Sequence, residues 1–305
     1  GKLAQVRADL GSPPILAFTA TAGREMQERI LASLGIPDAA IFVRDVDRPN
    51  IALLRRRCRV ERRPEEIGAL LRIPQVQGQK VMIFVPSTKA GDELKGKLAE
   101  LELDIPFYHS RFGTPFERQE LQKRFQGESL PVVDHIICTN AFGMGMDIPN
   151  VRLVIHWQQS ASVEDVLQEF GRAGRDRKSS VSVIFHDADG SSDIGRLKFM
   201  ADKTVENAKL DERGKAQMRA QRHRQIDQVA AMLKADSCFR EAIRGYFGDS
   251  VATPKRTLAK IILDWVFGTK ERASPAHFCC DHCDREFLKK RGFRAYVGTV
   301  LEETK

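Results

Sequence analysis

The sequence predicts an α/β fold: a doubly wound parallel sheet followed by a mainly helical module. From residue 49 to residue 188, short apolar runs alternate with amphipathic helical patterns, the order expected when each parallel strand returns through a helix. After residue 189 these runs end and long polar helical patterns follow. We therefore expect residues 49–188 to form the sheet domain and residues 189–305 to form a helical module with a basic tail.

Residues 1–48 form a separate leading segment in this prediction. They hold one predicted strand, at residues 15–18, and one predicted helix, at residues 24–34. A single strand and helix cannot bury both of their faces. We therefore expect this segment to be the end of a domain that begins upstream, together with the linker to the sheet domain.

The elements of the two larger parts follow from periodicity and capping signals. The predicted strands are residues 51–54, 81–85, 105–108, 136–138 and 151–155, and the predicted helices are residues 65–71, 88–103, 114–125, 193–201, 205–234 and the segment after Ser162. The helix start at residue 114 is the best defined. Thr114 can cap it, Pro115 suits its first turn and Glu117 can complete a capping box.

Polar side chains follow the strand at residues 136–138. Thr139 and Asn140 come directly after it, and Asp147 follows a glycine-containing turn. Open α/β sheets bind ligands outside the carboxyl ends of their strands. We therefore expect these three residues to lie together at one ligand site.

The helix after Ser162 carries the most charged candidate site. With about 3.6 residues per turn, Gln168, Arg172 and Arg175 share its polar face, provided the intervening glycines do not end the helix first. A guanidinium keeps its proton and offers five donors, so two of them suit a polyphosphate whose charge grows during phosphoryl transfer. The alternative is a solvated basic helix end, which the helix dipole favours by itself.

These residues lie in motifs that resemble those of the RecQ branch of superfamily 2 helicases. Residues 168–175, QEFGRAGR, resemble motif VI, and residues 141–150, AFGMGMDIPN, resemble motif V. Shorter matches to motif III, to the start of the second motor domain and to motif IV lie at residues 19–22, 47–50 and 82–87. The resemblance covers most of residues 15–285. It implies a RecA-like sheet domain and an ATP-driven DNA helicase that moves 3′ to 5′.

The resemblance also implies roles for single residues around a nucleotide. Contacts to ATP are implied for Gly145, Asp147, Gln168, Arg172 and Arg175. The catalytic groups among them would be Arg175 as arginine finger, Arg172 on a phosphate and Gln168 as a hydrogen-bonding group. Thr19 and Thr21 would couple the two motor domains. The phosphate loop and acidic box that hold ATP and Mg²⁺ would lie upstream, so we expect this chain alone to be inactive.

Contacts to single-stranded or partly duplex DNA are implied for Ser87, Thr88, His109, Arg111, Thr139 and Asn140. Arg111 stands where the family usually has glycine, which could add a phosphate contact or alter the loop. For His109, a purely structural role fits as well. The net charge of +8 suits a polyanionic partner only mildly. The arginine run at residues 55–63 is interpreted as a strand edge and solvated turn, because aromatic residues for base stacking are scarce around it.

Residues 91–97 imitate part of a phosphate loop, with the pattern G-x-x-x-x-G-K. Leu98 stands where Ser or Thr should bind magnesium. Leu94, Leu98 and Leu101 have helical spacing, which indicates an ordinary amphipathic helix. The segment is therefore not expected to bind nucleotide.

Cysteines near the end of the chain indicate a zinc site. Cys280 and Cys283 have the two-residue spacing that lets two thiolates meet one tetrahedral ion, and Cys238 with the following YFG resembles the start of the RecQ zinc module. His277, three residues before Cys280, is the expected fourth ligand, because the side chains of adjacent residues such as Cys279 and Cys280 point apart. The alternative is a set of reduced structural cysteines.

The composition is that of an ordinary globular protein. No apolar run approaches the roughly 18 residues of a membrane span, and the N-terminus lacks the apolar region of a signal peptide. We expect an intracellular protein that associates with DNA, in the bacterial cytoplasm and nucleoid or in a nucleus, without membrane contact. A second reading, from another class, is a non-catalytic nucleic-acid-binding protein whose motor-like fold lacks the ATPase half.

Overall fold

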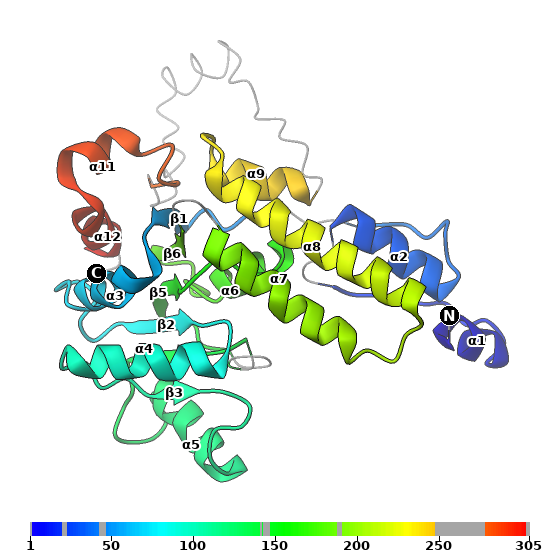
Figure 1. Ribbon diagram of the computed structural model, residues 1–305, viewed down its shortest axis with the longest axis horizontal. Helices are drawn as coiled ribbons and strands as arrows, with labels where there is room; N and C mark the ends of the chain where they lie inside the picture. The colour runs from blue at the N-terminus through cyan, green and yellow to red at the C-terminus, as the bar shows by residue number, and fades with distance from the viewer. Residues whose placement is uncertain are drawn as a thin grey trace, which may run out of the picture.

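Figure 1 shows a computed structural model of the chain, which describes residues 2–19, 23–42, 47–140, 142, 147–187, 191–247 and 278–302. Three predicted site residues, Thr21, Gly145 and His277, lie outside the described residues. Within the described part, every helix is too short or too polar to cross a membrane.

The centre of the fold is a six-stranded sheet with parallel neighbours, in the order β1-β6-β5-β2-β4-β3. The strands are β1 (Ile51–Arg57), β2 (Lys80–Phe84), β3 (Phe107–Tyr108), β4 (His135–Cys138), β5 (Val151–His156) and β6 (Ser180–His186). Parallel neighbours require crossover connections, and here helices supply them on both faces. The predicted doubly wound parallel sheet is confirmed.

Helices surround this sheet and continue after it (Figure 1). In the described residues they are α1 (Lys2–Asp9), α2 (Arg24–Leu34), α3 (Arg63–Leu71), α4 (Thr88–Glu100), α5 (Pro115–Gln126), α6 (Val163–Phe170), α7 (Ser191–Glu206), α8 (Glu212–Lys234), α9 (Phe239–Tyr246), α11 (Arg285–Arg291) and α12 (Phe293–Glu302). The predicted capping box of α5 is present, with Thr114 and Glu117 each accepting from the other's backbone N–H. The imitation phosphate loop lies inside α4, where Leu94 and Leu98 are buried.

The two faces of the sheet are covered by different helices. Met82 and Phe84 of β2 belong to one apolar cluster, which includes side chains of α5, α6, α8 and α9. Val81 and Ile83 belong to the other, which includes side chains of α3, α4 and α12. Figure 1 shows the same division, with α8 and α9 on one side and α12 beside α3. The expected basic tail is thus partly a helix whose Tyr296 is fully buried on the sheet.

The free edge of β1 is covered by the segment that carries the cysteines. The Leu53 N–H donates to the Cys279 carbonyl at 3.0 Å, and Leu53 forms a parallel bridge with Cys280. One step further along β1, the Arg55 guanidinium binds the Asp281 carboxylate at 2.9 Å. An uncovered parallel edge would expose unpaired backbone groups, so this segment completes the sheet.

The interpretation of residues 55–63 as a solvated arginine run is wrong for two of its members. Only 6% of the Arg55 side chain is exposed, and it also donates to the carbonyls of Ala235 and Ser237 after α8. Arg63 is completely buried. Both are buried because acceptors distant in the sequence fold onto them, which a local charge pattern does not reveal.

The predicted strand at residues 15–18 is also absent from the described structure, where these residues have no regular secondary structure. Leu16 and Phe18 are 83% and 90% exposed. A strand needs a hydrogen-bonding neighbour, and none of the described strands pairs with this segment.

Arg63 forms a buried ion pair with Asp193 of α7. Its two terminal nitrogens donate to the carboxylate oxygens at 3.0 and 2.6 Å, and Nη1 also donates to the Trp157 carbonyl at 2.8 Å. The second carboxylate oxygen additionally accepts from the Asp187 N–H at 3.1 Å. Because every charged group is paired, this contact joins the sheet domain to the helical module without leaving a buried charge unsatisfied.

We expect Asp193→Asn to destabilise the protein by about 3–5 kcal/mol, because it leaves the buried Arg63 without a counter-charge. The measurement is the free energy of unfolding from urea denaturation. Glu65→Gln is the matched control, since it breaks the exposed Arg62–Glu65 pair, and it should cost less than about 1 kcal/mol. Equal losses for the two variants would contradict a structural role for the buried pair.

Candidate functional site

The segment after α6 carries two of the predicted ATP-contacting arginines. Gly174 takes a left-handed conformation with φ +51°, and α6 has already ended before it. The prediction that Arg175 continues one helical face is therefore wrong. The Gly174 N–H instead donates to the Val151 carbonyl at 2.8 Å. This bond places residues 171–177, here named the arginine turn, against the start of β5, while Gln168 stays exposed on α6.

The arginine turn is held by side chains from the segment just before β1. The Arg48 guanidinium donates to the carbonyls of Gly171, Ala173 and Gly174 at 3.2, 3.1 and 2.7 Å. Asn50 Nδ2 donates to the Gly174 carbonyl at 2.8 Å. The last carbonyls of a helix lack partners within the helix and attract positive charge. Arg48 therefore fixes the shape of the turn.

Positive charges crowd around this turn. Burial lowers the pKa of Arg172, and the neighbouring charge of Arg175 lowers it further. Burial also lowers the pKa of Arg48, as do the charges of Arg175 and Arg177. Like charges held close together repel each other. The cluster therefore favours a ligand with several negative charges, and guanidinium groups match the geometry of phosphate.

Asp147 lies beside this turn. Its Oδ1 accepts from Arg175 Nη1 at 3.0 Å, and the two side chains are 82% and 33% exposed. Such an exposed pair contributes only about 0–1 kcal/mol, so an anion could replace Asp147 as the partner of Arg175. The expectation that Asp147 shares one strand-end site with Thr139 and Asn140 is wrong. Those two residues follow the end of β4, whereas Asp147 binds Arg175 of the turn at the start of β5.

Several predicted DNA contacts line up along the carboxyl edge of the sheet. Ser87, Thr139 and His109 follow the ends of the adjacent strands β2, β4 and β3. Thr139 and Asn140 line a cavity of about 350 Å³. His109 Nδ1 accepts from the Arg111 N–H at 3.2 Å, which is a structural contact, whereas the Arg111 side chain is exposed. The structure therefore brings these residues to one edge of the sheet.

Ser87 and Thr88 lie at the beginning of α4. The Ser87 Oγ accepts from the Ala90 N–H at 3.2 Å and so caps the helix. Thr88 is the first helical residue, and both residues are only partly buried. Unpaired N–H groups at a helix start suit phosphate oxygens. This end of α4 can therefore bind a nucleic-acid backbone.

A buried polar group next to the cavity was missed by the sequence analysis. Glu169 Oε2 lies 2.8 Å from His156 Nδ1 and accepts from Ser160 Oγ at 2.7 Å. Gln158 is 4% exposed, and its side-chain amide has no hydrogen-bond partner in the described structure. Glu169 could have been found from the sequence, because it lies inside the motif at residues 168–175. Gln158 has no such signal, because only its place beside the cavity distinguishes it.

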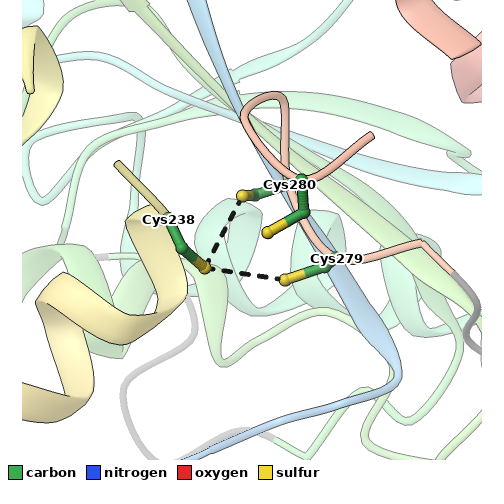
Figure 2. Close-up of side chains that lie close together, drawn as sticks. Cys238, Cys279 and Cys280 are labelled. Atoms are coloured by element: carbon green, nitrogen blue, oxygen red, sulfur yellow. Dashed lines mark hydrogen bonds between the residues drawn. The ribbon is translucent and has the colours of Figure 1, made fainter. Parts of the chain in front are cut away.

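Four cysteines form a compact cluster at the edge of β1. The sulfur atoms of Cys238, Cys279, Cys280 and Cys283 all lie within 4.8 Å of one another. Figure 2 shows Cys238 facing Cys279 and Cys280, and both of these sulfurs are 3.8 Å from Cys238 Sγ. Tetrahedral zinc with sulfur at about 2.3 Å implies sulfur separations of about 3.8 Å. The four thiols therefore fit a zinc ion.

The cluster includes Cys279, which the sequence analysis did not expect to be a metal ligand. Adjacent side chains were expected to point apart, yet both Cys279 and Cys280 face Cys238. Partial removal from water and the neighbouring sulfurs of Cys238 and Cys280 raise the pKa of Cys283 to about 12. The thiol therefore stays protonated at neutral pH by itself, and a bound cation would lower its pKa and release the proton.

Comparison with known proteins adds to this geometry. A model of the helicase conserved C-terminal domain matches residues 63–177. The probable ATP-dependent DNA helicase RecS of Bacillus subtilis is 29% identical to the chain, over 98% of the chain and 65% of the relative. The ATP-dependent DNA helicase RecQ of Synechocystis is 36% identical, over 55% of the chain and 34% of the relative. The family model and the RecQ and RecS relatives support a C-terminal region of a RecQ-type superfamily 2 helicase.

The chain spans 65% of the length of the first of these relatives and 34% of the second. Among solved structures, S. cerevisiae Dbp5 bound to RNA and ADP BeF3 has a TM-score of 0.50 and 20% identity, and the likeness covers 63% of this chain and 50% of that chain. At this identity the likeness concerns the fold alone. It supports the RecA-like assignment of the parallel sheet.

We expect Gly174→Ala to destabilise the protein by about 1–3 kcal/mol, because the new Cβ meets its neighbours and alanine resists a positive φ. An ideal Cβ would contact Asn50 Nδ2 and lie 2.6 Å from Ser180 Oγ. The free energy of unfolding tests this. Gly96→Ala is the control: it lies in α4 with nothing within 4 Å of its Cβ, and it should stabilise by about 0.5–1 kcal/mol. A stabilising effect of both variants would show that the turn does not need glycine.

Proposed function

We propose that the chain is the C-terminal half of an ATP-dependent DNA helicase of the RecQ type, in which the arginine turn completes a nucleotide site. The crowding of Arg48, Arg172, Arg175 and Arg177 at one turn carries the proposal. Here the carboxylate of Asp147 is a weak, exposed partner for Arg175, which leaves the cluster able to receive an anion.

Phosphoryl transfer depends on positioning and on positive charge that meets the growing negative charge. In this proposal Arg175 leaves Asp147 and contacts the transferred phosphoryl group as an arginine finger, while the half-buried Arg172 holds a phosphate oxygen. Gln168 hydrogen-bonds near the nucleotide. ATP and Mg²⁺ would be held mainly by the phosphate loop and acidic box of a first motor domain, because the 305 residues contain neither.

The carboxyl edge of the sheet would form part of the DNA track. Ser87 and Thr88 offer the start of α4, and Thr139 and Asn140 line the cavity beside it. Arg111 adds an exposed charge at the next strand end. Backbone phosphates of single-stranded DNA suit such hydroxyl and backbone N–H donors, and movement from 3′ to 5′ follows from the family resemblance.

The cysteine cluster would hold one structural zinc ion. Cys238 precedes α9, and Cys279, Cys280 and Cys283 lie on the segment that covers β1. A zinc ion would therefore join the helical module to the sheet edge. The sulfur separations favour Cys279 as the fourth ligand in place of His277.

The arginine finger is tested by Arg175→Ala in the full-length protein. We expect DNA-stimulated ATP turnover to fall by roughly 10³ or more, because the finger acts on charge that develops only in the transition state. DNA affinity should stay nearly unchanged. Arg177→Ala removes the same charge from the same turn and should cost less than about tenfold. The isolated 305-residue chain should show only background turnover.

Two results would contradict this assignment. Equal losses of turnover and DNA affinity in Arg175→Ala would indicate a structural role. DNA-stimulated turnover by the isolated chain, abolished by Arg175→Ala, would mean that a nucleotide site lies within these residues.

The zinc site is tested by metal analysis of the purified chain. We expect about one zinc per molecule, lost in Cys280→Ala and retained in Cys58→Ala, because Cys58 lies outside the cluster. Chelation should lower the melting temperature of the helical module, since structural zinc is coupled to folding. A metal-free preparation with an unchanged melting curve would contradict the proposed zinc site.

The identity of the fourth ligand is tested separately. Cys279→Ala should weaken zinc binding more than His277→Ala, and the reverse ranking would restore His277 as the ligand.

A further inference from the structure

Arg240 connects the helical module to the residues that hold the arginine turn. It lies on α9, two positions after Cys238, and its side chain is 12% exposed. It forms an ion pair with Asp47 and donates from Nη1 to the Arg48 carbonyl at 3.0 Å. From Nη2 it also donates to the Ile51 carbonyl. One guanidinium thus holds three groups of the segment that leads into β1.

The segment before β1, which Arg240 binds, also holds the arginine turn. Arg48, whose carbonyl Arg240 binds, directs its own guanidinium to the carbonyls of Gly171, Ala173 and Gly174. Arg48 therefore links the helical module to the turn. A displacement of the Arg48 backbone would move the guanidinium that fixes the turn, because all three of its bonds start from one planar group.

Arg240 is also tied to the cysteine segment. Its Nη2 lies 3.5 Å from the Cys279 carbonyl, which in turn accepts from the Leu53 N–H at 3.0 Å. The position of Arg240 thus depends on both sides of the cysteine cluster: α9 after Cys238, and the segment that begins at Cys279. The module is therefore connected by hydrogen bonds to the segment before β1.

We propose that Arg240 is a positioning residue for the arginine turn, through Arg48, so that the helical module sets the geometry of the nucleotide site as well as the stability of the fold. The geometric part concerns only this chain. Its consequence for catalysis rests on the proposed role of the turn in ATP hydrolysis. Small displacements of catalytic groups have large effects on rate, so a relay of this kind can control turnover without touching the nucleotide.

The geometric part is tested by hydrogen exchange of the purified 305-residue chain, read on a peptide that spans the arginine turn. The N–H groups of Gly174 and Asp176 report on it, because they donate to the carbonyls of Val151 and Pro149 at 2.8 and 3.2 Å. In Arg240→Gln we expect these two groups to exchange about tenfold faster, through local opening of the turn. The zinc content, measured in parallel, should stay unchanged.

Arg55→Gln is the matched control. Arg55 is also an almost buried arginine between β1 and the helical module, but it binds Asp281 and the carbonyls after α8 instead of Arg48. The Arg55→Gln variant should change the hydrogen-exchange rate at the arginine turn by less than twofold. Unchanged exchange in Arg240→Gln, or an equal change in Arg55→Gln, would overturn the proposal. If Arg240→Gln fails to fold, Arg240→Lys keeps a charge for Asp47 but gives up the forked contact with two carbonyls, and the turn should still exchange several-fold faster.

The catalytic part is tested in the full-length protein. Arg240→Gln should lower kcat for ATP several-fold with a smaller effect on KM and none on DNA affinity, because the finger is misplaced while the nucleotide still binds. Faster exchange with unchanged turnover would keep the relay and reject the role of the turn in hydrolysis. Slower turnover with unchanged exchange would reject the relay.

Discussion

A parallel sheet has two apolar faces and two open edges, and water must be kept from all of them. In this protein the residues after the sheet domain cover much of both faces and one edge of the sheet. Side chains of α8 and α9 join the core on one face and those of α12 join it on the other. The cysteine segment pairs with β1 at the edge. The helical module therefore cannot be a loosely attached appendage, and its placement fixes what lies next to the proposed nucleotide and DNA sites.

Arginine is the main connector between these parts. Arg48, Arg55, Arg63 and Arg240 each bind backbone carbonyls, and all but Arg48 also bind a carboxylate. A guanidinium suits this use because it has five fixed donors and keeps its charge when buried. Part of the net charge of +8 is therefore structural. Within the site described above, charge able to meet a polyanionic partner lies at the arginine turn, with one further exposed arginine, Arg111, at the carboxyl edge of the sheet.

Local sequence patterns predicted the elements well where the stabilising contacts are local. The capping box at Thr114 and the leucine-spaced helix over the imitation phosphate loop depend on residues three or four positions apart, and both are present. The motif at residues 168–175 identified the arginines, but not their arrangement. The helix α6 ends at Phe170, Gly174 takes a positive φ, and the turn takes its shape from Arg48, whose bond to the Gly174 carbonyl spans 126 residues.

The sequence by itself therefore determined the parallel α/β architecture, the family motifs and the cysteines able to bind a metal, because periodicity, caps and spacing are short-range properties. Only the tertiary structure decided which arginines are buried, which edge the cysteine segment covers and that Cys279 faces Cys238. Arg63 meets Asp193 across 130 residues, and Arg55 meets Asp281 across 226. Such partners come together only when the whole sheet folds, so no local pattern can distinguish a buried arginine from a solvated one.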